Sequence, residues 1–594
     1  MGKIRITVGL GSCGIASGAN KIYDKLKKEI ENKKIENVNL KKVGCIGICK
    51  YEPIVEIYNE GKRTTYINVK EDDVEKIISE HILKGNIVTD LLIDENIPNI
   101  TETAYFKNQT RIVLKNCGEV DPEDIDDYVK HGGYNALKRA LNMPKDVIID
   151  IIKKSKLRGR GGAGFYTGLK WEMVFNEESD IKYVCCNADE GDPGAFMDRS
   201  VLEGDPHSVI EAMAIAAYAV SSNEGYIYVR AEYPEAVKRL KIAIKQAEEK
   251  HYLGKNILGT DFSFNLNIRL GAGAFVCGEE TALMASIEGK RGEPKLRPPY
   301  PAHQGLYDKP TLLNNVETYA NITKIINNGY DWFTGYGTEK SAGTKVFAVG
   351  GKTNITGLVE IPIGTPLKTI IYDICGGILN GKEFKAAQTG GPSGGCIPKK
   401  LIDINMDYEN LIEIGSMMGS GGLIVMDNET CMVDIAKFFL EFTVDESCGK
   451  CVPCRIGIKR MLEIIEKITE GKATVKDLER LEMLANHIKS TSFCGLGQSA
   501  PNPVLSTLRY YKDEYLSHIV NKCCPAKVCK KLITYKIDKE KCVGCNLCSM
   551  SCPNKAIKGE VKTPHEIMQE LCVKCGTCYE KCKFGAISKE SGKW

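Results

Sequence analysis

The chain has 594 residues, a formal net charge of +3 at pH 7 and 25 cysteines. Its length predicts several domains, and so small a net charge gives no electrostatic reason to expect nucleic acid or a membrane surface as a partner. We find neither the apolar stretch of an export signal nor a run long enough to span a membrane. So many cysteines without an export signal indicate thiolate-bound metal in a reducing cytoplasm rather than disulfides.

The first half of the chain is predicted to be α/β. Residues 1–95 form a small unit with strands expected over 3–10, 38–45 and 53–59 and a helix over 20–34. A polar connector starts at residue 100 and leads into a large α/β block that ends near residue 340. Strand-like segments such as 182–187 alternate there with helical ones such as 234–250, which predicts a mostly parallel sheet covered by helices.

The second half is predicted to contain three more parts. Residues 341–430 are expected to be β-rich and punctuated by paired glycines, and residues 431–522 have the apolar spacing of helices. Residues 523–594 comprise a linker and two cysteine runs. Each run has the spacing C-x2-C-x2-C-x3-C, which gives three thiolates to one iron–sulfur cube and the fourth to its neighbour. Two [4Fe–4S] clusters are therefore favoured over zinc, one held by Cys542, Cys545, Cys548 and Cys582 and the other by Cys572, Cys575, Cys578 and Cys552.

Two further metal sites are suggested by cysteine spacing. A third [4Fe–4S] cluster is expected from thiolates at x2 spacing on a turn and one from a later helix pair, namely Cys448, Cys451, Cys454 and Cys494. In the linker, His518, Cys524 and Cys529 suit zinc, with the fourth ligand unidentified. Free linker thiols explain the same pattern equally well. If metal is bound there, it could fix the hinge between the helical residues 431–522 and the C-terminal part that contains the two cysteine runs.

Glycine-rich and polar loops punctuate the α/β block. In Arg158–Trp171, glycines let backbone N–H groups approach a phosphate, and Arg160 and Lys170 add positive charge, although the spacing is not G-x-G-x-x-G. Later loops carry acidic and amide side chains after strands, where they can bind ribose or ribityl hydroxyls. Each residue alone is better explained as a helix N-cap or an exposed charge, but the ordered set favours a binding site. The set is Asn187, Asp189, Glu190, Asp192, Glu279, Glu280, Asn314 and Asn315.

The motifs GRGGAGF, NADEGDPGAF, GAGAFVCGEETAL, NNVET, SCGKCVPCR and FCGLG, in this order, resemble the NADH-oxidising flavin subunit of respiratory complex I. With its N- and C-terminal additions, the chain is most similar to the β (diaphorase) subunits of multimeric [FeFe]-hydrogenases, many of which bifurcate electrons. The resemblance covers nearly the whole chain. It implies a thioredoxin-like unit at 1–95, an FMN- and NADH-binding core at 100–340, a ubiquitin-like unit at 341–430, a helical bundle at 431–522 and a ferredoxin unit with its linker at 523–594.

The resemblance also assigns site residues. The FMN site would be lined by Gly159, Arg160, Gly161, Lys170, Asn187, Asp189, Glu279, Asn314 and Asn315. NADH would face Phe165, Glu190, Asp192 and Glu280, with Arg297 and Tyr300 near its adenine half. Asp192 stands where respiratory subunits have Glu, and Phe275 where they often have Tyr, so both NADH and NADPH stay open as substrates. No side chain is expected to act as a catalytic acid, base or nucleophile, because the flavin does the chemistry.

The N-terminal unit departs from its family pattern. Thioredoxin-like [2Fe–2S] domains usually offer C-x4-C and then C-x3-C. Here Cys13, Cys45 and Cys49 are present, but Val8 stands at the fourth position. Either a [2Fe–2S] cluster with a substitute ligand or a docking module without a cluster would fit this pattern.

We therefore expect a cytoplasmic subunit that passes electrons from NADH through FMN to [4Fe–4S] clusters, the cluster of Cys454 being the first acceptor. The implied partners are a catalytic subunit, most simply an [FeFe]-hydrogenase, a small [2Fe–2S] subunit and ferredoxin, with bifurcation as an extension. A β subunit of formate dehydrogenase and an electron-wiring scaffold without working flavin are the alternatives.

Overall fold

The computed structural model describes residues 4–592, and contacts divide the chain into one unit of residues 1–382 and 387–425 and a second of 383–386 and 426–594. The first unit begins with a four-stranded sheet in the order β2-β1-β3-β4, in which only β1 and β2 are parallel. Alternate residues of β1, Ile6 and Val8, are buried against Leu26 of α2. The predicted strands and helix are confirmed as β1 (Ile4–Gly9), β2 (Val38–Val43), β3 (Val55–Asn59) and α2 (Ala19–Asn32), joined by β4 (Lys62–Tyr66), α1 (Ser12–Ala16) and α3 (Asp73–Lys76).

A four-stranded sheet forms the centre of the first unit. Its order is β7-β6-β5-β8, and every neighbouring pair is parallel, as predicted. The chain moves from β5 outward to β6 and β7 and then returns to the other side of β5 as β8. The order of strands therefore reverses between β5 and β8, which is where open α/β sheets bind ligands at the strands' carboxyl ends. The strands are β5 (Tyr183–Ala188), β6 (Glu224–Arg230), β7 (Asn265–Gly271) and β8 (Thr311–Asn315).

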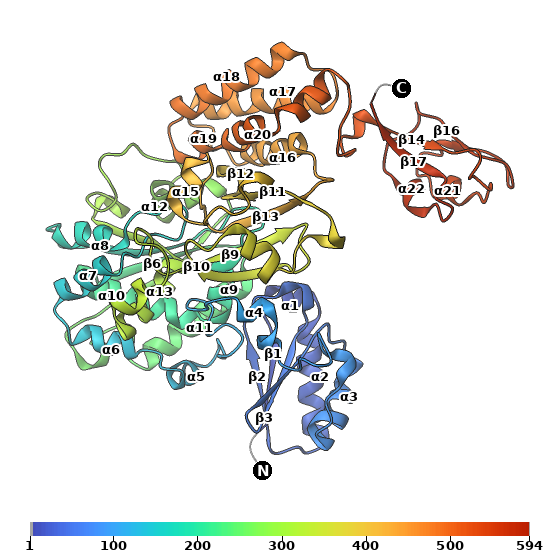
Figure 1. The fold of residues 1–594 in the computed structure, drawn as a ribbon. Helices are drawn as coiled ribbons and strands as arrows, with labels where there is room; N and C mark the ends of the chain where they lie inside the picture. Colours follow the sequence, from blue (N-terminus) through green and yellow to red (C-terminus); the bar gives the residue numbers. More distant parts are fainter. Residues whose placement is uncertain (1–3, 593–594) are drawn as a thin grey trace. The chain divides into compact units, whose positions relative to one another are not determined.

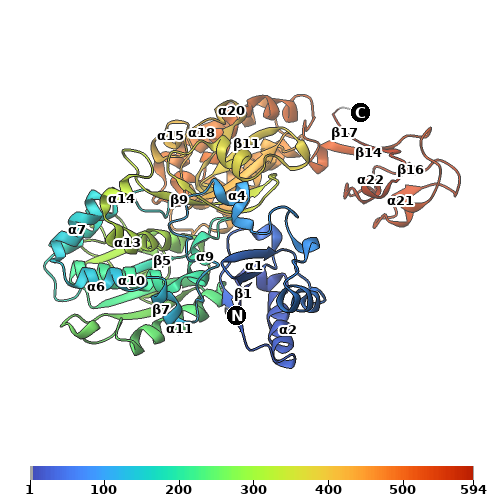
Figure 2. The same ribbon diagram turned by 60° about the horizontal axis from the view of Figure 1, so that its bottom comes forward.

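Helices cover this sheet (Figure 1 and Figure 2). α10 (Pro206–Val220) contacts β5 and β6 and packs against α13 (Val316–Asn328), so these two share one face of the sheet. All but one residue of α10 is buried, because its alanines and branched apolar side chains fit between neighbouring helices. The other helices of this part are α5 (Ile125–Lys130), α6 (Asn135–Leu141), α7 (Lys145–Lys154), α8 (Thr167–Asn176), α9 (Met197–Gly204), α11 (Pro234–Glu249), α12 (Glu280–Ile287) and α14 (Tyr330–Thr334), after the short α4 (Ala104–Lys107).

The predicted β-rich segment contains a five-stranded sheet in the order β10-β9-β13-β11-β12. β9 pairs antiparallel with β10 and parallel with β13. The bounds are β9 (Thr344–Gly351), β10 (Gly357–Pro362), β11 (Phe384–Thr389), β12 (Gly395–Pro398) and β13 (Gly422–Asp427), with α15 (Tyr408–Glu413) before β13.

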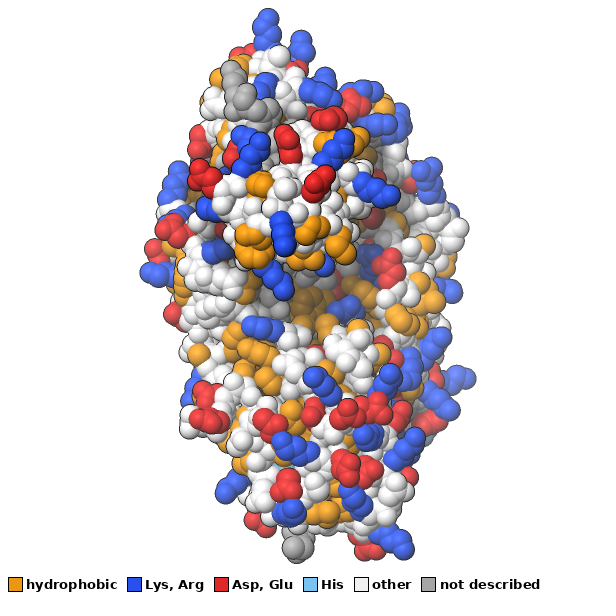
Figure 3. Space-filling view, turned by 90° about the vertical axis from the view of Figure 1, so that its right-hand side faces the viewer, with side chains coloured by type: hydrophobic (Ala, Val, Ile, Leu, Met, Phe, Trp, Pro, Cys, Tyr) orange, Lys and Arg blue, Asp and Glu red, His pale blue; other side chains and the backbone are white. Residues whose placement is uncertain are grey.

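The second unit contains a helical core and a small ferredoxin-like part. The core comprises α16 (Met432–Asp445), α17 (Lys459–Thr469), α18 (Val475–Thr491), α19 (Gly495–Ser499) and α20 (Asn502–Ile519). The small part pairs β14 (Ile533–Ile537) with β17 (Ile587–Ser591) and β15 (Ile557–Lys558) with β16 (Glu566–Ile567), and includes α21 (Leu547–Met550) and α22 (Thr577–Lys581). Among the described helices, none combines the length and the apolar character needed to cross a bilayer. On the face in Figure 3, acidic and basic side chains are interspersed around hydrophobic ones.

Candidate functional site

The polar loops predicted from the sequence converge on the carboxyl edge of the central sheet. Asn187 at the end of β5 pairs in register with Asn315 at the end of β8, across the point where the strand order reverses. Asn187 Nδ2 also donates to the carbonyl of Gly278, 2.9 Å away, which joins this edge to the loop before α12. Asn314 is buried next to Trp171, whose indole nitrogen lies 3.1 Å from its amide oxygen in the orientation that satisfies both groups. The edge thus gathers loops that are far apart in sequence.

The glycine-rich loop lies against this edge. A Cβ on Gly161 would approach Cβ of Asn315 to 3.1 Å, so the loop and the end of β8 are nearly in contact. Gly164 has a φ of +66°, and a Cβ there would lie 2.5 Å from the Tyr408 ring, whose hydroxyl donates to the carbonyl of Gly159. Glycine is therefore required here by the backbone conformation and by the packing of Tyr408.

Arg160 requires a correction. Its side chain was expected to add positive charge for a phosphate, but it is fully buried. Its guanidinium donates to the carbonyls of Thr344, Arg158 and Ala342. The charge is thus directed at three backbone carbonyls, and Arg160 holds the loop's shape rather than presenting a cation to a ligand.

Two residues expected at the flavin are N-caps in this structure. Asn315 Oδ1 accepts from the N–H groups of Glu317 and Thr318 and begins α13. Glu279 accepts from the N–H groups of Thr281 and Ala282 and begins α12. Capping fixes where these helices start and therefore holds both loops at the sheet edge. The sequence allowed an N-cap as the alternative explanation of each residue. In the structure both residues are N-caps and also lie at the candidate site.

An ion-pair cluster joins the residues expected on the flavin and nucleotide sides. Glu280 lies 2.6 Å from Arg297 and 3.6 Å from Lys170, whose ammonium also donates to the carbonyl of Leu313. Phe165 of the glycine loop and Tyr300, three residues after Arg297, are exposed, at 48% and 53% of their surface. Exposed rings are suited to stacking on a planar ligand.

The acidic loop 187–192 has two different environments. Glu190 is buried and accepts from the N–H groups of Asp198 and Arg199 at the start of α9. Burial raises its pKa above the usual range. Asp192 accepts from the hydroxyl of Ser420, and burial raises its pKa as well. Glu190 therefore faces α9, and Asp192 joins this loop to the segment before β13.

Phe275 also packs on the acidic loop. A Cβ on Gly191 would lie 2.7 Å from Phe275 Cδ2 and 2.7 Å from Arg230 Nη1. Because no side chain fits in that space, glycine is needed for the loop to pass beneath the ring. Asp189, between Asn187 and Glu190, is buried at the same edge, and its N–H donates to Asn187 Oδ1.

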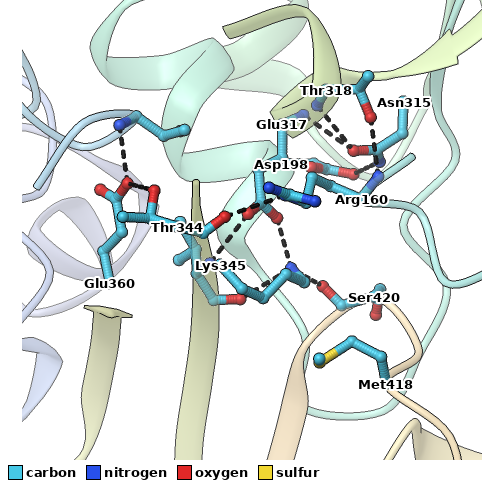
Figure 4. A network of polar contacts seen from close by, with 12 residues as sticks. Arg160, Asp198, Asn315, Glu317, Thr318, Thr344, Lys345, Glu360, Met418 and Ser420 are labelled. Atoms are coloured by element: carbon cyan, nitrogen blue, oxygen red, sulfur yellow. Dashed lines mark hydrogen bonds and ion pairs between the residues drawn. The ribbon is translucent and has the colours of Figure 1, made fainter. Parts of the chain in front are cut away.

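A buried charge network beneath the site was missed by sequence reasoning (Figure 4). Lys345, in β9, is fully buried and lies 2.5 Å from Glu317 of α13, and it also donates to the carbonyl of Ser420. Asp198 lies 2.5 Å from Asn315 Nδ2. Burial, and next the charges of Glu190 and Glu317, raise the pKa of Asp198 well above its usual range. Glu317 belongs to the quoted NNVET motif, but nothing in the sequence near Lys345 indicates that it is the partner.

The donor groups present fit a phosphorylated planar cofactor. The glycine loop leads directly into α8, so backbone N–H groups of the loop and first helical turn can face an anion. Thr167, at the start of α8, is buried, and its hydroxyl has no hydrogen-bond partner among the described residues. Lys170 follows one turn later. This combination of donors would hold a phosphate, and the amides at the sheet edge would hold hydroxyl groups. Thr167 was not predicted.

Four thiols expected to bind one cluster lie together in the helical core. Burial, and then the nearby thiols Cys451, Cys494 and Cys448, raise the pKa of Cys454 to about 11. A Cβ on Gly497 would lie 3.1 Å from Cys454 Cβ, so α19, which follows Cys494, packs directly on Cys454. The structure thus brings the three thiols of the turn to the later cysteine.

The ferredoxin-like part gathers thiols from both runs. One pocket is lined by Cys542, Cys545 and Cys548 of the first run and by Cys582 of the second. This is the crossed set expected from the spacing. In the second expected set, Cys578 is buried in the small apolar cluster of this part, against which Cys552 and Cys572 pack, and Cys575 is exposed.

The structure adds a fourth candidate metal ligand to the linker site, one that the sequence did not indicate. Ligand atoms of Cys431, His518, Cys524 and Cys529 all lie within 4.8 Å of one another, and all four residues are buried. His518 Nε2 is 3.5 Å from Cys431 Sγ and 3.3 Å from Cys529 Sγ, while its Nδ1 contacts the Glu514 carbonyl at 2.7 Å. Three thiols and an oriented imidazole are suited to tetrahedral zinc.

The three N-terminal thiols also converge. Hydrogen bonds with Cys49 lower the pKa values of Cys13 and Cys45, the former to about 6. Cys45 is buried, and its sulfur accepts from the N–H of Gly47. Val8 is fully buried in the apolar core of this domain and offers no ligand.

Four families of known domains match the chain. They are the thioredoxin-like [2Fe–2S] ferredoxin at residues 1–81, the Nuo51 FMN-binding domain at 152–324, the iron–sulfur binding region of NADH-ubiquinone oxidoreductase-F at 434–518 and a 4Fe–4S dicluster domain at 535–588. These matches agree with the order of parts expected from the motifs.

Individual relatives match over long stretches. The NADP-reducing hydrogenase subunit HndC of Solidesulfovibrio fructosivorans is 57% identical over 82% of this chain and 99% of its own length. An F-type subunit of the NADH-quinone oxidoreductase of Rhizobium meliloti is 44% identical over 70% of this chain and 99% of its own. The crystal structure of an NAD⁺-reducing [NiFe]-hydrogenase in the H₂-reduced state superposes with a TM-score of 0.62 at 28% identity, covering 87% of this chain and 84% of that one. The chain therefore belongs to the family of NADH dehydrogenase-type subunits that carry FMN and iron–sulfur clusters, which includes the flavin subunit of complex I and the diaphorase subunits of hydrogenases.

Proposed function

We propose that this chain binds FMN on the glycine loop, takes electrons from NADH at the carboxyl edge of the central sheet, and passes them to three [4Fe–4S] clusters. The observation that carries the proposal is the convergence of the glycine loop, the start of α8 and the loops after β5 and β8 at the point where the strand order reverses. Bound FMN supplies the conversion of a two-electron hydride into single electrons.

The chain's own residues would act by binding and orientation. Thr167, Lys170 and the loop's N–H groups would hold the phosphate, and Asn187 and Asn314 would contact the ribityl chain and ring. Phe165 and Glu280 would face the nucleotide. Because Glu280 pairs with both Lys170 and Arg297, it also keeps two cations from repelling each other at the mouth of the site.

We further propose the assembly in which the chain works. Its similarity to a hydrogenase subunit favours a catalytic hydrogenase chain as a partner. We place this chain in the [FeFe] class, with a small [2Fe–2S] subunit beside it in the cytoplasm, because of the resemblance of the motifs. Ferredoxin would exchange electrons through the C-terminal clusters, and bifurcation between NAD and ferredoxin would be a property of the whole complex. NADH is proposed over NADPH, but the relative HndC is named as NADP-reducing, so both nucleotides must be compared.

The first test adds NADH or NADPH anaerobically to separate samples of the purified chain. Flavin absorbance and iron–sulfur EPR are followed together. Bleaching of the flavin and new cluster signals with NADH would support the proposal. Reaction with NADPH alone would show a preference for NADPH over NADH and would point to the acidic loop at Asp192 as its cause. A chain that retains clusters but binds no flavin, even after FMN is supplied, would favour the electron-wiring alternative.

Glu280→Ala is expected to raise the Kd for NADH about ten-fold or more while FMN stays bound. A charge-assisted hydrogen bond contributes roughly 1.5–3 kcal/mol, and the variant also leaves Lys170 and Arg297 without their shared carboxylate. Rapid-mixing measurements of flavin reduction at several NADH concentrations give the Kd. As a matched control, Glu172→Ala removes an exposed carboxylate of α8 that pairs with Lys153 and should leave the Kd unchanged. Equal Kd values for the two variants would contradict the role.

Cys454→Ser is expected to remove one [4Fe–4S] EPR signal and to stop reduction of the C-terminal clusters by NADH, while NADH still bleaches the flavin. The thiol is buried among three others, so its loss leaves one iron without its ligand. Cys582→Ser serves as the matched comparison, because it should disturb only the C-terminal part. Undiminished reduction of those clusters in Cys454→Ser would exclude this route.

A further inference from the structure

The N-terminal thiols share their buried corner with two carboxylates, of which that of Glu203 already accepts from the N–H and the hydroxyl of Ser12, whereas that of Glu52 is less completely bonded. Cys13 lies in α1, Cys45 follows β2, and Cys49 begins the turn Cys49–Tyr51, directly before Glu52. The nearby thiols of Cys13 and Cys45 raise the pKa of Cys49 far above its usual range. Glu52 is only 6% exposed, and Cys45 is close enough to influence the pKa of its carboxyl group. Three thiols and the carboxylate of Glu52, from three different segments, therefore meet in one place.

The carboxylate of Glu52 is fixed but incompletely satisfied. Its Oε2 accepts from the N–H of Ile54 at 3.0 Å, whereas Oε1 has no partner of normal hydrogen-bond geometry among the described residues. Burial, and next the charge of Cys45, raise the pKa of Glu52 well above its usual range. A buried carboxyl facing thiols is costly unless a cation joins them.

Two glycines leave room for this carboxylate. A Cβ on Gly9 would lie 3.3 Å from both carboxylate oxygens, and one on Gly14 would lie 3.1 Å from Oε2. Gly9 follows Val8, the position at which related domains carry their fourth thiol, and Gly14 follows Cys13. The Glu52 carboxylate thus packs against the backbone at Gly9, next to the position of the missing thiol, and at Gly14, next to the thiol of Cys13.

We propose that Glu52 replaces the missing cysteine, so that Cys13, Cys45, Cys49 and Glu52 together hold a [2Fe–2S] cluster. An ionised carboxylate brings the same charge as a thiolate, so the cluster keeps the net charge it would have with four cysteines. Its oxygen is a harder ligand than sulfur, and ligand type is one of the features that set a cluster's potential. The proposal deepens the match of residues 1–81 to thioredoxin-like [2Fe–2S] ferredoxins and is independent of the nucleotide site.

The surroundings of the site supply one balancing charge. Arg199 Nη2 lies 3.9 Å from Cys13 Sγ, and the backbone N–H of Arg199 donates to Glu190. Arg199 lies in α9, which begins five residues after the acidic loop of the flavin site ends. The side chain of Arg199 would therefore connect the cluster to α9, the helix whose first turn is held by Glu190 of the flavin site. This arrangement favours a cluster that exchanges electrons over an isolated structural metal.

The test compares the full-length chain with Glu52→Gln, Glu52→Cys and Cys49→Ser, after reconstitution with ferrous iron and sulfide. Iron and sulfide per chain, Mössbauer spectra and EPR at temperatures where [4Fe–4S] signals broaden away report the [2Fe–2S] cluster. Wild type is expected to show it. Glu52→Gln and Cys49→Ser should lose it, and Glu52→Cys should keep the iron but shift the g-values, because sulfur replaces oxygen.

Loss through misfolding is distinguished by a matched variant. Glu56 of β3 is also buried but is paired with Arg63 at 2.8 Å and with Thr65. Glu56→Gln should lower thermal stability and keep the cluster. Glu52→Gln should lose the cluster while its apoprotein stays about as stable as the wild-type apoprotein, because the glutamine oxygen can still accept from the N–H of Ile54. Flavin bleaching by NADH should persist in both. Unchanged iron and g-values in Glu52→Gln, or wild type without a [2Fe–2S] signal, would overturn the proposal.

Discussion

Replacing Cys431 with serine is expected to abolish the zinc binding that we propose for the second unit and to unfold its helical core at temperatures where wild type is folded. The four buried ligands come from the start of α16, the end of α20 and the following linker, so one ion would tie three segments together. Structural zinc contributes about 10–16 kcal/mol in zinc-finger peptides, far more than a typical core side chain. Zinc per chain, measured by mass spectrometry, and loss of helical circular dichroism on heating report the effect.

The neighbouring pair Cys523 and Cys524 provides the control. Cys524 is fully buried among the ligands, whereas Cys523 is half-buried and its sulfur contacts the carbonyl of Ser591. Cys523→Ser should keep the zinc and the wild-type melting curve. Cobalt substitution adds a second readout, because three thiolates and one imidazole around Co²⁺ give intense visible bands that Cys431→Ser should lack. Wild-type zinc content in Cys431→Ser would contradict the assignment.

The sequence indicated three of the candidate zinc ligands but not the fourth, because the fourth is distant along the chain. His518, Cys524 and Cys529 are close in sequence, so their spacing alone suggests a site. Cys431 lies 87 residues before His518, and only the packing of α16 on α20 brings them together. A lone cysteine before an apolar helix is indistinguishable in sequence from a small buried hydrophobe.

At the flavin site, too, the sequence predicted some features and could not predict others. Sequence placed Asn187 and Asn315 after strands, and the parallel sheet brings them side by side, because carboxyl ends of parallel strands share an edge. Sequence could not show that Arg160 faces inward, since a loop arginine carries no sign of its direction. The partners it binds, Thr344 and Ala342, belong to a segment almost two hundred residues away.

Lys345→Met is expected to lower the free energy of unfolding of the first unit by about 3–5 kcal/mol, because it leaves Glu317 charged, buried and without its partner. Lys345 also donates to the carbonyl of Ser420, whose hydroxyl holds Asp192. The variant should therefore weaken NADH binding as well as stability. Flavin fluorescence, which rises when FMN is released, follows unfolding of this unit in urea.

Two comparison variants separate burial from ion pairing in general. Lys154→Met breaks an exposed pair with Asp150, at 2.7 Å, and should cost less than about 1 kcal/mol. Lys345→Met combined with Glu317→Gln removes both charges and should recover part of the loss, since no unpaired charge stays buried. If Lys345→Met costs no more than Lys154→Met, the pair contributes nothing beyond a surface contact. If the double variant is no more stable than Lys345→Met alone, the network acts through geometry rather than charge, and the positioning of Ser420 and Asp192 becomes its main role.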